Sequence, residues 1–300
     1  MATSPSHELG EMIGNFFEDA MKSPIHEICA KYNVYFDTIG PRPARNSKKI
    51  TWQDINGSKH DLDYVIERNG TRDNIGEPIG FIELAWRRYT KHSKNKVQEI
   101  AGAVLPIAEK YKELAPFKGA ILSGEFTEPS LKQLENQGFH VLYIPFVNVV
   151  TSFEKYGVHL FFDEDTPKAE LAQIVRKFSS CKNLDLIRQD FIEANQDIIK
   201  GFMDALEASL RRRIKSIFIL PLHGKGIKFT NLQQAITYIQ GYAEIPTDAP
   251  LDRIAICIDF NDGSCIKCEF KDKDMAMNFL HRNCCEYCEH LVDQDGLSKR

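Results

Sequence analysis

The sequence has no apolar run that approaches the roughly 20 residues of a membrane-spanning helix. Its first residues, MATSPSHELGEM, contain no apolar core of signal-peptide length. Low-complexity segments are absent, and so are a dinucleotide-binding glycine fingerprint, a phosphate-binding glycine-rich loop and a nucleophile elbow around a serine. These absences predict a soluble, cytoplasmic protein with no membrane partner, and they argue against nucleotide-dependent enzymes and serine hydrolases.

The chain also lacks an excess of charge of one sign. It has 38 Lys and Arg against 42 Asp and Glu, which gives a formal net charge of -4 over 300 residues. Nucleic-acid affinity that depends on a positive field over the whole protein is therefore excluded, and any polyanion site must be a local patch. The apolar fraction of 43% is enough for one large core or two smaller ones.

Eight cysteines are present, and in an intracellular protein they are expected as thiols or metal ligands rather than as disulfides. Cys265 with Cys268 and Cys285 with Cys288 have the Cys-x2-Cys…Cys-x2-Cys spacing of a structural Zn²⁺ site. However, Cys265 and Cys268 fall in a predicted strand, where an odd offset puts them on opposite faces. Neither pair contains the Gly or Pro of a tight knuckle turn. Free thiols are therefore favoured, and a zinc site stays open as the alternative.

The first half of the chain has the pattern of an α/β fold. Helical periodicity over residues 7–32 is interrupted by Pro24, which predicts two helices there. The Asn56-Gly57 pair predicts the turn of a hairpin. The elements predicted next are a strand at 79–86, a helix from Ser93 to about Lys112, a strand at 117–126, a helix closing on Gly138 and a strand at 139–146. A strand–helix–strand unit of this length predicts a crossover between parallel strands.

The second half contains helices and an internal repeat. Residues 166–178 predict an amphipathic helix, and residues 184–213 predict one long helix that connects two domains. Within 214–300, Phe229 aligns with Phe270 and Ala235 with Ala276, a period of about 41 residues. Each copy predicts two strands and a helix, and the pair predicts a small α+β domain for recognition or dimerisation. The domains predicted are therefore 1–183, 184–213 and 214–300.

Residues 80–96, GFIELAWRRYTKHSKNK, place one carboxylate in an apolar strand directly before the most basic stretch of the chain. Asp63 lies at the polar edge of the strand before it. Consecutive strands usually pair, so Asp63 and Glu83 are expected to meet. Two carboxylates with a backbone carbonyl and waters form an oxygen site that suits Mg²⁺. The cations that follow Glu83 would then hold an anionic substrate such as a phosphodiester backbone.

This pattern of two acids on successive strands, followed by helix, strand, helix and strand, resembles the core of the PD-(D/E)XK nuclease superfamily over residues 8–146. The resemblance implies a mixed central sheet flanked by helices, with Asp63 and Glu83 as metal ligands and catalytic residues. Position 85, where the family usually has lysine, is Ala85. Lys96, in the first turn of the next helix, is the predicted catalytic substitute, and Lys94 and Lys91 are weaker candidates for that role.

The resemblance implies a Mg²⁺-dependent endodeoxyribonuclease of the type II restriction class, which acts on double-stranded DNA as a homodimer and accepts Mn²⁺ as a substitute. The predicted DNA-binding residues are Arg42, Arg45, Lys48 and Lys49, which are expected to hold phosphates from a basic loop, and Arg87, Arg88, Lys91 and Lys94 after Glu83. Glu18 and Glu27 are expected on solvated helix faces. Three alternatives stay open: a repair or recombination nuclease of the same fold, a catalytically inactive nuclease-like protein that binds DNA, and a zinc-containing interaction protein.

Overall fold

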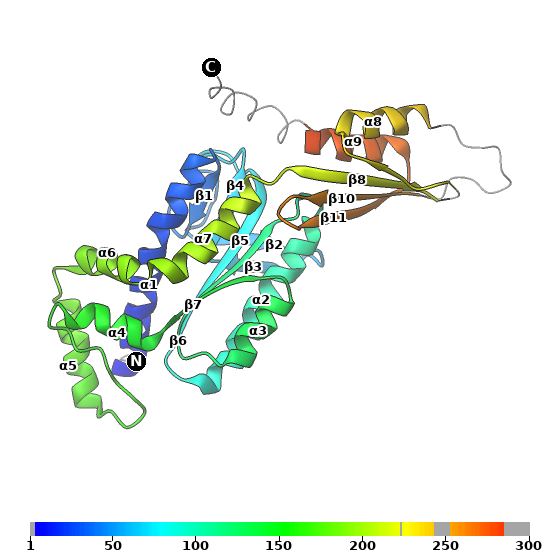
Figure 1. Ribbon diagram of the computed structural model, residues 1–300. Helices are drawn as coiled ribbons and strands as arrows, with labels where there is room; N and C mark the ends of the chain where they lie inside the picture. The colour runs from blue at the N-terminus through cyan, green and yellow to red at the C-terminus, as the bar shows by residue number, and fades with distance from the viewer. Residues whose placement is uncertain (1–3, 223, 243–252, 285–300) are drawn as a thin grey trace, which may run out of the picture. The chain divides into compact units, whose positions relative to one another are not determined.

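The computed structural model describes residues 4–222, 224–242 and 253–284 (Figure 1). The chain divides into two compact units. Unit 1 comprises Met1–Lys110 and Pro116–Glu207, and unit 2 comprises Tyr111–Ala115 and Ala208–Arg300. Among the residues that the structure describes, no helix has the length and apolar character needed to cross a membrane.

Unit 1 is built on a five-stranded mixed sheet with the order β1-β4-β5-β6-β7. The strands are β1 (Tyr35–Thr38), β4 (Tyr64–Arg68), β5 (Glu77–Arg87), β6 (Phe117–Gly124) and β7 (His140–Pro145). Strands β1, β4 and β5 pair antiparallel, whereas β5, β6 and β7 run parallel. Every residue of β5 except its two ends is buried. A strand covered on both faces has a nearly continuous apolar sequence, and this explains why β5 is so evident in the sequence.

A separate hairpin interrupts the main sheet in sequence between β1 and β4. It consists of β2 (Ile50–Gln53) and β3 (Lys59–Leu62), which pair antiparallel. Gly57 in its turn has φ of +87°, a conformation that a residue with a Cβ rarely adopts. The Asn56-Gly57 turn predicted from the sequence is therefore confirmed. Strand β3 leads directly into Asp63 and β4, so the hairpin borders the first of the two predicted metal ligands.

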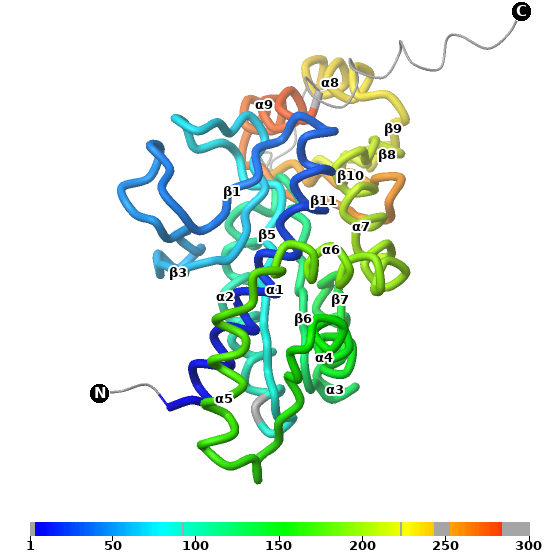
Figure 2. The backbone as a smooth tube through the Cα atoms, turned by 90° about the vertical axis from the view of Figure 1, so that its left-hand side faces the viewer, coloured from blue at the N-terminus to red at the C-terminus, as the bar shows by residue number. Residues whose placement is uncertain are grey.

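Helices cover both faces of the unit 1 sheet (Figure 1). Helices α2 (Ser93–Lys110) and α3 (Glu128–Asn136) lie on one face, and α1 (Pro5–Lys31), α4 (Phe146–Glu154) and α6 (Leu184–Ala194) lie on the other. Figure 2 shows α1 and α6 together with α5 (Lys168–Ser179), which also packs on α1. Two 3-10 turns, η1 (Thr90–His92) and η2 (Lys112–Leu114), flank α2. This part of the chain is thus an α/β fold with a mixed central sheet between helices.

Helix α1 runs continuously through Pro24, so the predicted break at this residue is wrong. A proline inside a helix costs roughly 3 kcal/mol because it removes a hydrogen bond and crowds the preceding turn. Packing outweighs that cost, since each fully buried apolar side chain contributes about 1.5–3 kcal/mol. The buried side chains on both sides of the proline are Leu9, Ile13, Phe16, Phe17, Ala20, Met21, Ile25 and Cys29.

The single long helix predicted for residues 184–213 is also wrong, because two helices, α6 and α7 (Gln196–Leu210), meet at Asn195. The Asn195 side chain is buried. It donates to the backbone oxygen of Phe191 at 2.7 Å and accepts from Nδ2 of Asn148 at 2.6 Å. An asparagine that bonds locally to the backbone competes with the helix, which ends here. Asn148 lies in α4, a helix that the sequence did not predict.

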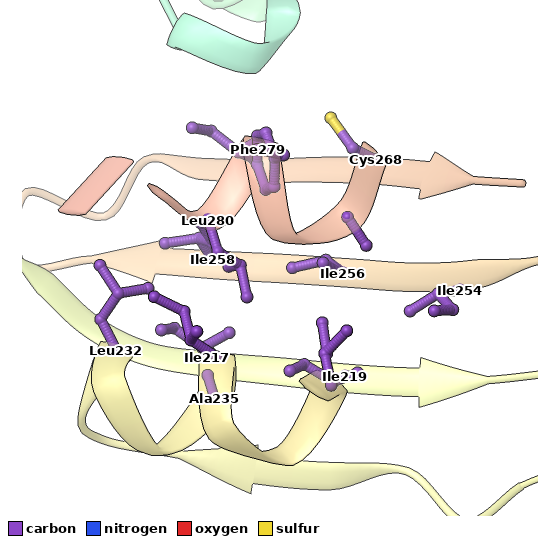
Figure 3. Close-up of a cluster of buried hydrophobic side chains, with 14 of the residues drawn as sticks. Ile217, Ile219, Leu232, Ala235, Ile254, Ile256, Ile258, Cys268, Phe279 and Leu280 are labelled. Carbon is purple, nitrogen blue, oxygen red and sulfur yellow. The ribbon is translucent and has the colours of Figure 1, made fainter. Parts of the chain in front are cut away.

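Unit 2 contains two successive strand–strand–helix segments, as the internal repeat predicted. They are β8 (Ile214–Pro221), β9 (Ile227–Phe229) and α8 (Leu232–Gly241), then β10 (Ile254–Phe260), β11 (Cys265–Phe270) and α9 (Lys273–Cys284). The strands form one antiparallel sheet with the order β11-β10-β8-β9. Alternate isoleucines of β8 and β10 point toward α8 and α9 and form the core (Figure 3). Successive side chains of a strand point to opposite faces of the sheet, so every second residue belongs to this buried face.

Candidate functional site

Asp63 and Glu83 lie side by side on neighbouring strands of unit 1. Asp63 precedes β4, and Glu83 lies in β5, which pairs antiparallel with β4. The backbone N–H of Asp63 donates to Oε1 of Glu83 at 3.2 Å. The backbone N–H of Leu84 donates to Oδ2 of Asp63 at 2.7 Å. Glu83 therefore accepts a bond from Asp63, in the one-residue bend between β3 and β4, and Asp63 accepts one from Leu84 in β5, so the backbone orients both carboxylates.

The two acids share a site that is short of positive charge. The Glu83 side chain is buried, and burial together with the charge of Asp63 raises its pKa to about 8. Burial also raises the pKa of Asp63, although the Leu84 N–H and the charge of Lys96 oppose this shift. Desolvation disfavours the ionised form of a carboxyl group, and a second carboxylate nearby does the same. A cation between Asp63 and Glu83 would offset both effects.

Lys96 supplies the positive charge that the structure brings to this pair. It lies in the first turn of α2, with 21% of its side chain exposed, and its charge lowers the pKa of both Asp63 and Glu83. Its Nζ also lies 3.5 Å from a carboxylate oxygen of Glu99. Ala85, at the position where the resemblance places lysine, is buried in β5. The predicted substitute thus lies within electrostatic reach of both acids.

Glu18 joins the site, although it was expected on a solvated helix face. Burial and the charge of Asp63 raise the pKa of Glu18 to about 7, and Glu18 in turn raises the pKa of Glu83. The hydroxyl of Tyr64 donates to the backbone oxygen of Glu18 at 2.5 Å, which ties α1 to the first residue of β4. The sequence signal was the position of Glu18 directly after Phe17, at the border of the apolar stripe of α1.

The donor set at this place fits Mg²⁺. Mg²⁺ usually keeps several waters and binds through one or two carboxylates together with substrate phosphates. Asp63 and Glu83 would hold the ion, and Glu18 would stand close to it. No group of three or more His, Cys, Asp and Glu side chains forms a complete metal cage within the described residues. Backbone carbonyls, water or substrate would therefore have to complete the coordination.

Arg42 was predicted to contact DNA, but the structure contradicts this role because its guanidinium is buried and fully used. It forms ion pairs with Asp37 at 2.8 Å and with Glu67 at 2.7 Å. It also donates to the backbone oxygens of Thr71 and Asn74. A buried charge is tolerated when it is paired and hydrogen-bonded in this way, so Arg42 organises the interior.

Arg45 is also internal rather than a phosphate ligand, so that prediction is corrected too. Only 9% of its side chain is exposed, and it pairs with Asp37 at 2.9 Å. Its Nη1 and Nη2 also donate to the backbone oxygens of Thr38, Gly40, Ser47 and Lys49. Lys49, in contrast, is 68% exposed and pairs with Asp61 at 2.6 Å. Of the four cations predicted in this loop, Lys48 and Lys49 therefore remain accessible.

The cations after Glu83 divide into internal and accessible ones. Arg88 donates from Nε to the backbone oxygen of Phe162 at 2.7 Å, and its guanidinium lies 4.2 Å from the ring centre of Phe146. These contacts use the side chain inside the protein, which contradicts the predicted DNA contact of Arg88. The accessible cations are Arg87, which lies 4.0 Å from Glu99, Lys91, which pairs with Glu164 at 2.6 Å, and the exposed Lys94.

The structure separates the two cysteines of the first predicted zinc pair. Cys268 is buried in the core of unit 2, whereas Cys265 is exposed on the opposite face of β11. Because opposite faces of a strand cannot share one ion, Cys265 and Cys268 do not form half of a zinc site. Cys285 and Cys288 lie outside the described residues.

Comparisons with known proteins add little to this site. No protein-family model matches the chain, and no curated protein matches it. A solved structure titled "Crystal Structure of Protein of Unknown Function AF1548" is similar with a TM-score of 0.28 and 14% sequence identity, over 62% of this chain and 98% of that chain. A likeness at this level carries no argument about fold or function, so the proposal below depends on the residues themselves.

Proposed function

We propose that this chain is a Mg²⁺-dependent endodeoxyribonuclease of the PD-(D/E)XK type that hydrolyses phosphodiester bonds in double-stranded DNA. The observation that carries the proposal is the contact between Asp63 and Glu83 on neighbouring strands, with Lys96 acting on both charges. Two adjacent carboxylates have the chemistry of a hard-metal site, and the lysine adds the cation that phosphodiester chemistry requires.

The order of elements in unit 1 supports the same proposal. Helix α1 is followed by the antiparallel strands β1, β4 and β5, then by α2 and the parallel strand β6. The resemblance implied the part of this order that begins at Asp63: a strand with the first acid, a strand with the second acid, then helix, strand, helix and strand, which correspond to β4, β5, α2, β6, α3 and β7. The hairpin of β2 and β3 is an insertion between β1 and β4.

The residues have distinct tasks in the proposed reaction. Asp63 and Glu83 hold Mg²⁺, and their backbone hydrogen bonds keep the carboxylates in place as substrate binds. When bound, Mg²⁺ polarises a phosphoryl oxygen and lowers the pKa of an attacking water. Lys96 offsets the negative charge that grows on the phosphate in the transition state, an interaction that raises the rate rather than the affinity.

A type II restriction enzyme is the specific form that we propose. Such an enzyme cuts both strands of a symmetric site, and a symmetric homodimer presents one site to each strand. A recombination or repair nuclease would use the same three residues. Measurement of the oligomeric state and of the cleavage pattern on plasmid DNA separates these forms: defined fragments favour restriction, and a smear of products favours the other nucleases.

A catalytically inactive DNA-binding protein is the second candidate. Two observations favour it: Ala85 stands where the family usually has lysine, and Lys96 is already engaged by Glu99 at 3.5 Å. Such a protein would retain Asp63 and Glu83 without transition-state stabilisation. It would bind duplex DNA and cut it at no measurable rate.

Incubation with supercoiled plasmid tests these candidates directly. The purified chain is incubated with plasmid in Mg²⁺, Mn²⁺, Ca²⁺ or EDTA, beside the matched variant Glu83→Gln purified in the same way. The proposal expects nicked and linear DNA in Mg²⁺ and Mn²⁺, none in EDTA, and none with Glu83→Gln. Equal cleavage by the variant would refute the assignment of the site. Binding of duplex DNA without cleavage in any metal would favour the inactive candidate.

A further inference from the structure

Arg45 organises the loop between β1 and β2, residues 39–49, which we call the Arg45 loop. Its guanidinium donates to five acceptors in or next to this loop: Oδ1 of Asp37 at 2.9 Å and the backbone oxygens of Thr38, Gly40, Ser47 and Lys49 at 3.1, 3.2, 3.0 and 2.7 Å. One side chain therefore binds both ends of the loop. A loop of this length without such a tie has to lose its conformational entropy when it binds a ligand.

Other bonds complete the closed shape of the Arg45 loop. The backbone N–H of Gly40 donates to the backbone oxygen of Lys48 at 2.8 Å, and the N–H of Ala44 donates to the oxygen of Arg72 at 3.2 Å. The buried Arg42 connects the loop to Asp37 and to the β4–β5 loop. The number of bonds that join the two ends of this loop to each other and to the strands beside it indicates a loop with one fixed conformation.

The fixed conformation brings two lysines near the candidate site. Thr38, at the end of β1, is in register with Tyr64, the residue after Asp63. Because Arg45 and Gly40 hold the backbone of Lys48 and Lys49 against this end of β1, the two lysines follow it there. The ion pair between Lys49 and Asp61, two residues before Asp63, is a second link to the same place.

Both lysines are available to an anion. Lys48 is exposed, and 68% of the Lys49 side chain is exposed. The pair of Lys49 with Asp61 lies in solvent, where such pairs contribute about 0–1 kcal/mol. A phosphate oxygen can therefore replace Asp61 at Lys49 at small cost. Cations on a preformed backbone bind phosphates without the ordering cost that flexible lysines have.

We propose that the Arg45 loop is a preformed clamp that fixes the DNA backbone beside Asp63, with Lys48 and Lys49 as the phosphate ligands and Arg45 as the positioning residue. This inference depends on the proposed nuclease function, and it specifies the place at which the protein holds the duplex. The ligand is the phosphodiester backbone, so the clamp acts on any DNA sequence. Its contribution is to the position and affinity of the substrate, whereas Lys96 acts on the rate.

The first test compares two double variants of the full chain. Lys48→Ala with Lys49→Ala removes the clamp, and Lys132→Ala with Lys200→Ala removes two exposed lysines that pair with acids on helices α3 and α7. Duplex binding is measured in Ca²⁺ over a range of salt concentrations, and KM and kcat in Mg²⁺. For the clamp variant we expect roughly tenfold weaker binding and a salt slope smaller by about two, as loss of two phosphate contacts requires. Its KM should rise with kcat nearly unchanged, and the control should match the parent.

The second test addresses Arg45. Arg45→Met should release the loop, so trypsin should cut after Lys48 and Lys49 much faster than in the parent protein. The same variant should bind duplex DNA more weakly than the parent. When Arg45→Met is added to the Lys48→Ala, Lys49→Ala variant, the affinity should not fall further, because all three substitutions remove the same phosphate contacts. Arg45→Lys should restore part of the protection. Lysine acylation of the parent with and without duplex DNA needs no variant: DNA should protect Lys48 and Lys49 but not Lys132.

The outcomes separate this inference from the function on which it depends. If the parent cuts DNA while the Lys48→Ala, Lys49→Ala variant keeps the parent affinity and KM, the clamp is wrong and the nuclease stands. Absence of protection of Lys48 and Lys49 by DNA would overturn the clamp in the same way. An unchanged trypsin pattern in Arg45→Met overturns the positioning role. A parent that neither binds nor cuts DNA overturns both the function and the clamp.

Discussion

The side chain of Glu83 accepts a hydrogen bond from the backbone N–H of Asp63, 20 residues away in sequence. This contact joins the bend before β4 to β5. It places two carboxyl groups in a partly desolvated site whose electrostatics also include the charge of Lys96. A site of this kind is unfavourable without a bound cation and favourable with one, and this property makes the following predictions testable with simple measurements.

Neutral isosteres at the two proposed metal ligands should abolish cleavage without loss of the fold. Asp63→Asn and Glu83→Gln each keep the shape of the side chain but remove the charge that Mg²⁺ needs. We expect DNA cleavage to fall by at least about a hundredfold, since the Mg²⁺ contribution to transition-state stabilisation is worth several kcal/mol. Thermal melting without metal should be unchanged or improved at pH 8, because a disfavoured buried charge is gone. Full activity of either variant would contradict the ligand assignment.

The metal-free protein should become less stable as the pH rises from about 4.5 to about 8. Glu83 has a folded pKa near 8, above its ordinary value, so the folded state holds a proton that the unfolded state has lost over this range. Among the charged groups that act on Glu83, Asp63 and Glu18 raise its pKa further, and Lys96 lowers it. Urea unfolding at pH 6 and pH 8 measures the decrease in the free energy of unfolding. This decrease should be smaller in Glu83→Gln.

Mg²⁺ should therefore stabilise the protein more at pH 8 than at pH 6. At the lower pH the ion has to displace protons from Glu83, which weakens its binding. Thermal melting with and without Mg²⁺ at the two pH values measures this difference, and Glu83→Gln serves as the control that should respond weakly at both. An equal shift of the melting temperature at both pH values would show that the ion binds elsewhere.

Lys96→Ala should lower the cleavage rate by about two to four orders of magnitude with little change in duplex affinity, because the proposed role of its charge is in the transition state. The matched control is Lys132→Ala, an exposed lysine of α3 that pairs with Glu128. Ala85→Lys in the Lys96→Ala background tests whether the family position can replace it. Parent-like rates in Lys96→Ala would move the catalytic cation to Lys94 or Lys91.

The internal and accessible arginines after Glu83 should respond in opposite ways. Arg87→Ala should leave the melting temperature nearly unchanged and reduce the salt slope of DNA binding by about one, as expected for one phosphate contact. Arg88→Ala should instead lower the stability by about 1–3 kcal/mol, since it removes a hydrogen bond to Phe162 and a cation–π contact with Phe146. Urea unfolding and binding in Ca²⁺ separate the two effects.

Arg42→Met tests the buried ion-pair cluster. Glu67 would lose its arginine partner in the interior, where it is fully buried, and Asp37 would keep only Arg45. Removal of one partner of a buried pair costs about 3–5 kcal/mol because the other charge is left uncompensated. The free energy of unfolding should fall by this amount. A variant as stable as the parent would mean that solvent enters the cluster.

The sequence by itself determined the elements whose signals are local. The apolar run of β5, the Asn56-Gly57 turn and the two strand–strand–helix segments of unit 2 were all predicted, because periodicity and turn chemistry depend on a few neighbouring residues. The chain order of Asp63, Glu83 and Lys96 on successive elements also indicated their proximity. Neighbouring strands usually pair, and α2 begins directly after β5.

Only the tertiary structure decided the features that depend on distant partners. Helix α1 continues through Pro24 because packing on both sides outweighs a local penalty. The side chain of Asn195, which bonds locally to Phe191 where α6 ends, also accepts a bond from Asn148, far away in sequence. Arg42 and Arg45 look like surface cations in the sequence. They are internal because Asp37, Glu67 and backbone oxygens of two loops surround them. A charge is buried or exposed according to whether the fold supplies its counter-charge, and no local pattern carries that information.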